Sequence, residues 1–393
     1  MSLIAFYVSC FLAFIAGHML NYTAILFALE FFESSTIAGI AYGLCFGPPI
    51  IFGWIAGAYI DRYGAKTVLL LAQNLFILGG LGMLLVIVIQ PSYSLLLFLL
   101  SNVLVGIAWA FVAPARYACL GQYMSVDRLG QSTITLNLLV MLGFGLAPII
   151  LTQIESHLSW QWVAIIAVSM FTLSSLMLVN APNQHIRLTH QNLKQEWHDC
   201  FSQLKQFPVI TQLLLAAIIG YLLMGPMQVV LPQIAKINLQ LNTVEIGQYL
   251  GLIAVALIVG GLLAMKLKHV VHIGKSIALL LLLAGIFVAL LGRIELVWLS
   301  CIVLLVGTTM AGVIVSFIVA GLQHNTPQAI RGRVMSMYTI ISQVISAIAG
   351  VLAGTIADIF SPSVSLYLVG AIFVVASLVL ALKAKALMEF KRL

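Results

Sequence analysis

The sequence predicts an all-α integral membrane protein in which twelve spanning helices form two pseudo-symmetric bundles of six. Three observations predict this fold class. Only 7% of the 393 residues are charged and 62% are hydrophobic, whereas a soluble domain carries about 25% charged residues. Apolar runs long enough to cross a bilayer, which takes about 20 residues, recur along the chain. The lysines and arginines between these runs gather on one side of the predicted membrane.

The apolar runs are predicted to be helices. A bilayer offers the backbone no water, so only helices or a closed barrel can cross it. Long runs without strand alternation favour helices. The predicted spans cover residues 3–29, 36–60, 67–90, 94–117, 129–151, 161–180, 209–233, 244–265, 276–292, 295–320, 333–357 and 363–383.

The basic residues predict the orientation of these spans. With both termini in the cytoplasm, all but two of the 18 lysines and arginines lie on the cytoplasmic side, and the exceptions are Lys236 and Arg293. The positive-inside rule predicts this bias. The net charge of +7 therefore reflects orientation and contact with anionic lipid rather than binding of nucleic acid. The five cysteines are scattered singly, which favours neither a disulfide framework nor a metal site.

A polar stretch divides the chain nearly in half. We predict an N-terminal bundle over residues 1–180, a cytoplasmic linker over 181–208 and a C-terminal bundle over 209–393. Within the linker, Leu193, Trp197 and Leu204 recur at helical spacing, which predicts an amphipathic helix on the membrane surface. A plain tether between the halves is the alternative.

The sharpest motif runs from Gly57 to Lys66, as Gly-Ala-Tyr-Ile-Asp-Arg-Tyr-Gly-Ala-Lys. It resembles the G-x-x-x-D-R-x-G-x-K signature of the major facilitator superfamily, which implies a secondary transporter in a bacterial inner membrane. The stretches Pro114–Leu120 and Arg331–Ser336, the latter running on to Asp358, are similar to the subgroup of bacterial siderophore and drug exporters. The first stretch also resembles lysophospholipid transporters, so it does not separate the two.

The resemblance implies a cytoplasmic gate that opens and closes during transport. Gly57 would let a neighbouring helix approach closely, Gly64 would permit a tight turn, and Asp61 could pair with a cation such as Arg116. A loop that only sets orientation is the alternative. The predicted gate residues are Gly57, Asp61, Arg62, Gly64, Lys66, Arg116, Arg331 and Arg333.

Two positions depart from the family pattern. Asn102 stands where many members carry an arginine linked to proton coupling, which puts coupling through this position in doubt. The run Gly143–Pro148 matches the antiporter motif only in part, because Ala147 replaces a glycine. It gives slight support to export.

The first span carries the polar residues that are most informative about substrate. His18, Asn21 and Tyr22 share one face of a helix, and a histidine can titrate near physiological pH. His18 is therefore either a proton-responsive group or a neutral contact between helices. Further candidates for the cavity wall are Asn102, Trp109, Asn137, Met141, Met224, Gln228 and Gln343.

These residues predict a secondary active exporter of a small amphipathic molecule, siderophore-like or drug-like, that works by alternating access with protons as a candidate coupling ion. Amides, aromatic rings and methionines suit such a substrate better than a small ion. Lysophospholipid movement between leaflets is the alternative within the transporters, and a receptor or scaffold is the alternative outside them. No nucleophile–base pair, metal cluster or phosphate-binding loop occurs in the sequence, so we expect no enzyme activity, cofactor or metal. We expect a monomer.

Overall fold

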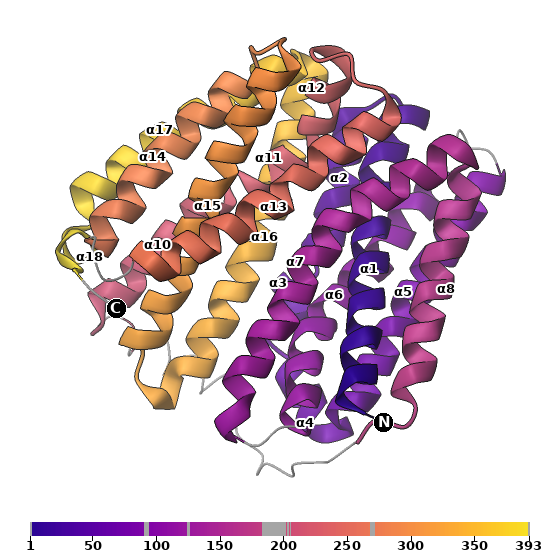
Figure 1. Cartoon of the computed structure of the whole chain (residues 1–393), viewed down its shortest axis with the longest axis horizontal. Helices are drawn as coiled ribbons and strands as arrows, with labels where there is room; N and C mark the ends of the chain where they lie inside the picture. Colours follow the sequence, from indigo (N-terminus) through magenta and orange to yellow (C-terminus); the bar gives the residue numbers. More distant parts are fainter. Residues whose placement is uncertain are drawn as a thin grey trace. The chain divides into compact units, whose positions relative to one another are not determined.

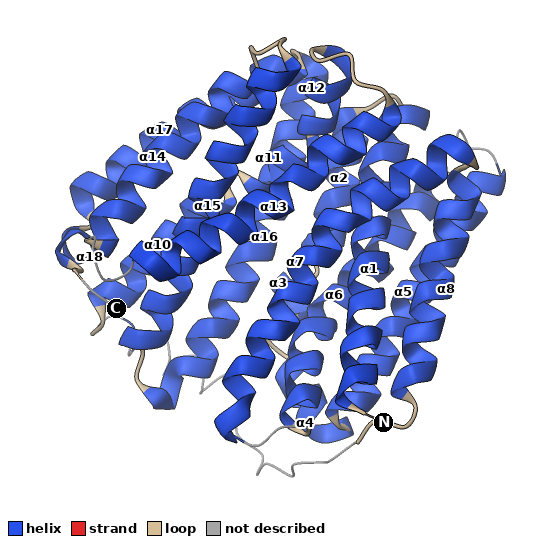
Figure 2. Cartoon of the chain, in the orientation of Figure 1, coloured by secondary structure: helices blue, strands red, loops and turns tan. Residues whose placement is uncertain are grey.

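The computed structural model describes residues 2–89, 94–123, 126–182, 202, 204, 206–267 and 272–391, without the side chains of 126–131 and 328–329. Across these ranges the chain is helical and contains no strand (Figure 2). Twelve helices among the described residues are long and apolar enough to cross a membrane, which confirms the predicted fold class. The predicted linker helix falls almost wholly outside the described residues.

The helices of the first half follow the predicted spans closely (Figure 1). Their bounds are α1 Leu3–Phe31, α2 Ser35–Phe46, α3 Pro49–Phe52, α4 Ala56–Tyr63, α5 Ala65–Ile89, α6 Leu95–Gly121, α7 Val126–His157 and α8 Trp160–Leu178. Those of the second half are α10 Pro208–Tyr221, α11 Met224–Val229, α12 Leu231–Ile237, α13 Thr243–Leu267, α14 Ile273–Leu291, α15 Val297–Asn325, α16 Gln328–Ile359, α17 Pro362–Lys383 and α18 Lys385–Glu389.

The chain contains two compact units. The first consists of Met1–Leu188 with Leu241–Ala254, and the second of Thr189–Gln240 with Val255–Leu393. The beginning of α13 therefore groups with the first unit and its remainder with the second.

The second and seventh spans are interrupted. In the second, α2 ends at Phe46 and α3 begins at Pro49, because proline lacks the N–H that would continue the helix. The paired prolines Pro48 and Pro49 are the sequence signal for this break. At this break α6 packs closely against the second span at Gly106. A Cβ on Gly106 would collide with the backbone oxygen of Leu44 and the ring of Pro48.

A hydrogen-bonded polar cluster joins α1, α5 and α8 inside the first unit. The Ser9 and Ser174 hydroxyl oxygens are 2.8 Å apart, and the Gln73 amide donates to Ser174 Oγ at 2.8 Å. The Ser175 hydroxyl donates to Gln73 Oε1. Ser9, Gln73 and Ser174 are fully buried. Because every partner in this cluster is satisfied, it ties the three helices together.

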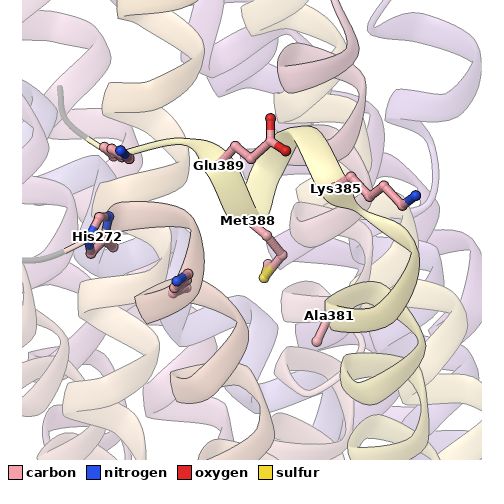
Figure 3. A pocket seen from close by; sticks show the side chains of 7 residues that line it. His272, Ala381, Lys385, Met388 and Glu389 are labelled. Atoms are coloured by element: carbon pink, nitrogen blue, oxygen red, sulfur yellow. The ribbon is translucent and has the colours of Figure 1, made fainter.

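The end of the described chain folds back onto α14 in the second unit. Leu387 of α18 is fully buried, and a Cβ on Gly274 would collide with its carbonyl oxygen. The Gly274 N–H donates to Phe390 O at 3.1 Å, which caps the start of α14. A pocket of about 280 Å³ lies beside this contact (Figure 3). It is lined by His272, Lys275, Ala381, Lys385, Met388, Glu389 and Lys391.

Candidate functional site

His18 lies in the interior of the first unit between aromatic rings from two other helices. Its side chain is 9% exposed. The ring centroid is 5.1 Å from that of Trp109 on α6 and 5.2 Å from that of Phe144 on α7, the latter edge-on. Its Nε2 has no hydrogen-bond partner among the described residues. Two aromatic rings therefore flank His18, and its Nε2 is unpartnered among the described residues.

Asn21 lies one turn further along the same face of α1. Its Oδ1 accepts a hydrogen bond of 3.1 Å from the Trp109 indole N–H, and its Nδ2 has no partner in the described part of the chain. The ring of Tyr22 lies 6.0 Å from that of Phe144. The structure thus brings together the three first-span candidates and Trp109. Only their shared face of α1 was evident from the sequence.

Asn102, Trp109 and Arg116 form one stripe along α6, because residues seven apart lie on one face of a helix. At one end, the Asn102 amide donates to Phe98 O at 2.8 Å, and Cys45 Sγ donates to Asn102 Oδ1 at 3.3 Å. Asn102 is 1% exposed. These contacts give Asn102 a structural role between α2 and α6.

Arg116 ends this stripe as a fully buried cation. Its side chain is 1% exposed, and its Cζ lies 3.8 Å from the centre of the Phe14 ring on α1. None of its three guanidinium nitrogens has a hydrogen-bond partner among the described residues. The predicted pair between Asp61 and Arg116 is therefore not formed, because the Arg116 side chain turns into the bundle toward Phe14.

The other candidates are distributed over both units. In the first, Asn137 is exposed and accepts a hydrogen bond from the Tyr117 hydroxyl, while Met141 is half-buried. In the second, Gln228 is 5% exposed, and Met224 is half-buried.

Two tyrosines of the second unit were not predicted. The hydroxyl oxygens of Tyr221 and Tyr338 are 2.7 Å apart, and their ring centroids 5.8 Å. Gln343, a predicted wall residue five positions beyond Tyr338, has an unpartnered Oε1 within the described residues. Both tyrosines lie in predicted spans, and no motif in the sequence distinguishes them.

The predicted gate turn has the backbone that its sequence requires. Gly64 has φ 85°, a left-handed conformation that favours glycine. Lys66 Nζ donates to Val179 O at 2.6 Å and so neutralises the carbonyl end of α8. Asp61 is half-buried, and this burial raises the pKa of its carboxyl. The Arg62 guanidinium lies 5.3 Å from the Tyr63 ring.

The remaining gate candidates give a mixed outcome. A Cβ built on Gly57 meets no atom within 4 Å, so the predicted close helix approach at Gly57 is wrong in this structure. Arg331 Nε and Nη2 donate to Thr326 O at 3.3 and 3.2 Å, which caps the end of α15. Arg333 also has an interaction partner. In this structure Arg331 therefore caps the end of α15.

Comparison with known proteins decides the family. Residues 6–350 match the profile of the Major Facilitator Superfamily. The chain belongs to this superfamily. Its relatives include the enterobactin exporter EntS of Escherichia coli O1:K1, which is 25% identical over 337 residues, covering 85% of this chain and 80% of EntS. EntS of Shigella boydii serotype 4 matches to the same extent.

Solved major facilitator structures share the fold at low sequence identity. A POT family transporter in complex with a thioalcohol-conjugated peptide has a TM-score of 0.76 and 13% identity, and the match covers 98% of this chain and 96% of that one. The nucleoside transporter NupG has a TM-score of 0.76 and 13% identity, with 98% and 99% covered. The protein is accordingly a multi-pass transporter of the inner membrane and not an enzyme.

Proposed function

We propose that this major facilitator protein is a secondary exporter of a small amphipathic molecule of the siderophore or drug type, working by alternating access. The observation that carries the proposal is the set of buried polar atoms on His18 of α1 and Arg116 of α6, which have no partner among the described residues and lie beside aromatic rings. Ligand sites combine such apolar walls with a few placed polar groups. The 25% identity to the enterobactin exporter EntS supports export.

The proposal is tested by transport in inside-out vesicles from cells with and without the protein. In such vesicles the cytoplasmic face is outside, so an exporter accumulates its substrate in the lumen. Metabolite profiling of the two cell lines first identifies compounds retained when the protein is missing. We expect at least one amphipathic compound to accumulate in vesicles that contain the protein. Equal uptake by both vesicle types for every such compound contradicts the proposal.

Lysophospholipid transport is the second candidate, favoured by the run Pro114–Leu120. The same vesicles, loaded with a fluorescent lysophospholipid in the outer leaflet, distinguish the two candidates. Protein-dependent loss of the lipid from the outer leaflet, without uptake of soluble compounds, would support this second function instead.

We further propose that the turn between α4 and α5 acts as the cytoplasmic gate. Its left-handed Gly64, the anchor from Lys66 to α8 and the half-buried Asp61 support this role. Asp61→Asn removes the charge at nearly constant volume, so it should abolish most transport while leaving membrane insertion unchanged. Normal turnover by a well-expressed Asp61→Asn variant would count against the gate.

A further inference from the structure

The guanidinium of Arg116 is a buried charge that the described side chains do not neutralise. Arginine stays protonated inside proteins, and a charge within a membrane protein is costly unless it is paired. The titratable side chains that lie nearest to Arg116 among the described residues are those of Cys10, Tyr117 and Cys119. These are two thiols and a phenol, and none of them is a carboxylate.

No described carboxylate is hydrogen-bonded to the Arg116 guanidinium. Glu30 and Glu33 follow Phe14 by at least 16 residues on α1 and beyond its end, which is about 24 Å at 1.5 Å per residue. Asp61 makes no hydrogen bond to the Arg116 guanidinium, whose nitrogens have no partner among the described residues. Among the described side chains, the site thus offers a positive charge without a hydrogen-bonded counter-ion.

In the Arg116–Phe14 contact the hydrogen-bond donors of Arg116 are buried and have no partner among the described residues. The N–H groups of a guanidinium lie in its plane and point outward from its edges. The Phe14 ring, 3.8 Å from Cζ, occupies the region over the guanidinium. A planar or tetrahedral anion can therefore bind the edge through two parallel hydrogen bonds, which is the strongest arrangement arginine offers.

The surface next to Arg116 continues along α1 as an aromatic wall with two polar nitrogens. His18 lies one turn beyond Phe14 on the same face, with the rings of Trp109 and Phe144 at 5.1 and 5.2 Å. The unpartnered Nε2 of His18 and Nδ2 of Asn21 follow at successive turns. A charged end and an apolar wall with polar positions together complement an amphipathic molecule that carries an anionic group.

We propose that Arg116 binds the anionic group of the transported molecule, so that the substrate class is amphipathic organic anions with an aromatic or apolar body. The anionic group is a carboxylate, sulfonate or phosphate, and the body lies along Phe14, Trp109 and Phe144. This inference rests on the proposed transport function and narrows it from amphipathic molecules in general to anions.

The test uses two probes that differ only in charge. Anilinonaphthalene sulfonate and N-phenylnaphthylamine share one ring system, and only the first carries a sulfonate. Stabilisation of the purified full chain against thermal unfolding in one detergent reports binding of each probe. We expect the sulfonate to bind wild type at least tenfold more tightly than the neutral analogue. Equal binding of the two probes overturns the proposal.

Three variants assign the preference to Arg116. Arg116→Gln should lower sulfonate affinity about tenfold to a hundredfold, the range expected for hydrogen bonds to a charged group, and should leave the neutral probe unaffected. Arg116→Lys keeps the charge and should retain an intermediate preference. The matched control is Arg293→Gln, because Arg293 also lies over an aromatic ring, Tyr367 at 5.0 Å, but is exposed.

The outcomes separate this inference from the proposed function. An unchanged sulfonate preference in Arg116→Gln overturns the inference, as does loss of the preference in Arg293→Gln. If Arg116→Gln fails to fold, the wild-type preference and Arg116→Lys decide the question. Vesicle uptake of the two probes supplies the second readout. Binding that depends on Arg116 without uptake of any compound contradicts transport alone, whereas protein-dependent uptake of both probes at equal rates contradicts the anion specificity alone.

Discussion

Polar groups on two faces of α1 differ in whether they are hydrogen-bonded. On one face, the fully buried Ser9 is hydrogen-bonded to Ser174, which also accepts a bond from Gln73. On the other face, Phe14 and His18 meet α6 and α7, and the nearby Arg116 guanidinium and His18 Nε2 have no partner among the described residues. Both faces are buried, so the difference is not one of solvent access.

The difference supports the proposal that the paired face holds the bundle together and that the unpaired face binds the transported molecule. Satisfied polar clusters between membrane helices stabilise their packing. Unsatisfied buried groups destabilise the fold, and functional sites carry such costs in return for activity. Removing a polar group from the paired face should therefore lower stability, and removing one from the unpaired face should raise stability or leave it unchanged while activity falls.

The largest effect is expected for Arg116→Met, which removes the charge and keeps a long flexible side chain. Replacing buried charges by apolar groups of similar volume can stabilise a protein by about 1–4 kcal/mol. We expect a higher midpoint of thermal unfolding together with loss of most transport. Arg293→Met is the control and should change stability by less than about 0.5 kcal/mol. A lower midpoint for Arg116→Met would show that the guanidinium stabilises the fold.

The second effect has the opposite sign. Gln73→Leu leaves the hydroxyls of the buried Ser174 and the half-buried Ser175 without their shared amide partner, which should cost about 1–3 kcal/mol. Thermal unfolding in detergent measures the loss, and transport per folded molecule should stay near that of wild type. A Gln73→Leu variant that is as stable as wild type but inactive would place function on the paired face and reverse the comparison.

A smaller loss of stability is expected where cations cap helix ends. Lys66→Met removes the bond from Nζ to Val179 O, and Arg331→Met removes the bonds to Thr326 O. Interactions of a cation with a helix C-terminus are worth about 0.3–1 kcal/mol. Both variants should unfold slightly earlier than wild type. If only Lys66→Met also slows transport, the α4–α5 turn has a gating role that the α15–α16 turn lacks.

The spans were predictable because a bilayer leaves the chain few choices. Apolar length and charge placement give each span, and the paired prolines Pro48 and Pro49 are the signal for the break before Pro49. The interruptions of the seventh span after Tyr221 and at Val230 were not predicted, although Pro226 and Pro232 were the available signal.

The candidate site was predictable only helix by helix. Spacing places His18, Asn21 and Tyr22 on one face of α1, and Asn102, Trp109 and Arg116 on one face of α6. It does not say how the helices are rotated against one another. The contacts of His18 with Phe144 and of Arg116 with Phe14 depend on that rotation. For the same reason a motif shared with a family could suggest the pair of Asp61 and Arg116, while the packing of α1 against α6 excludes it here.

The smallest effect on stability is expected at His18, where the effect on function separates two roles. His18→Phe keeps a ring between Trp109 and Phe144 and removes the unpartnered Nε2, so stability should stay within about 0.5 kcal/mol of wild type. Phenylalanine cannot titrate. If His18 carries a coupling proton, His18→Phe abolishes accumulation driven by a pH gradient, while downhill exchange of the same compound continues.

His18→Gln completes the test, because glutamine keeps a hydrogen-bonding group but loses the ring. The coupling role predicts that both variants lose gradient-driven accumulation alike. A structural role predicts a different result. His18→Gln removes the ring between Trp109 and Phe144, so it should lose stability together with both kinds of transport. The matched control is His157→Gln, because His157 is exposed at the end of α7 and bonds to Gln153 O. Unchanged gradient-driven accumulation in His18→Phe would remove His18 from coupling and confine it to the wall of the anion site.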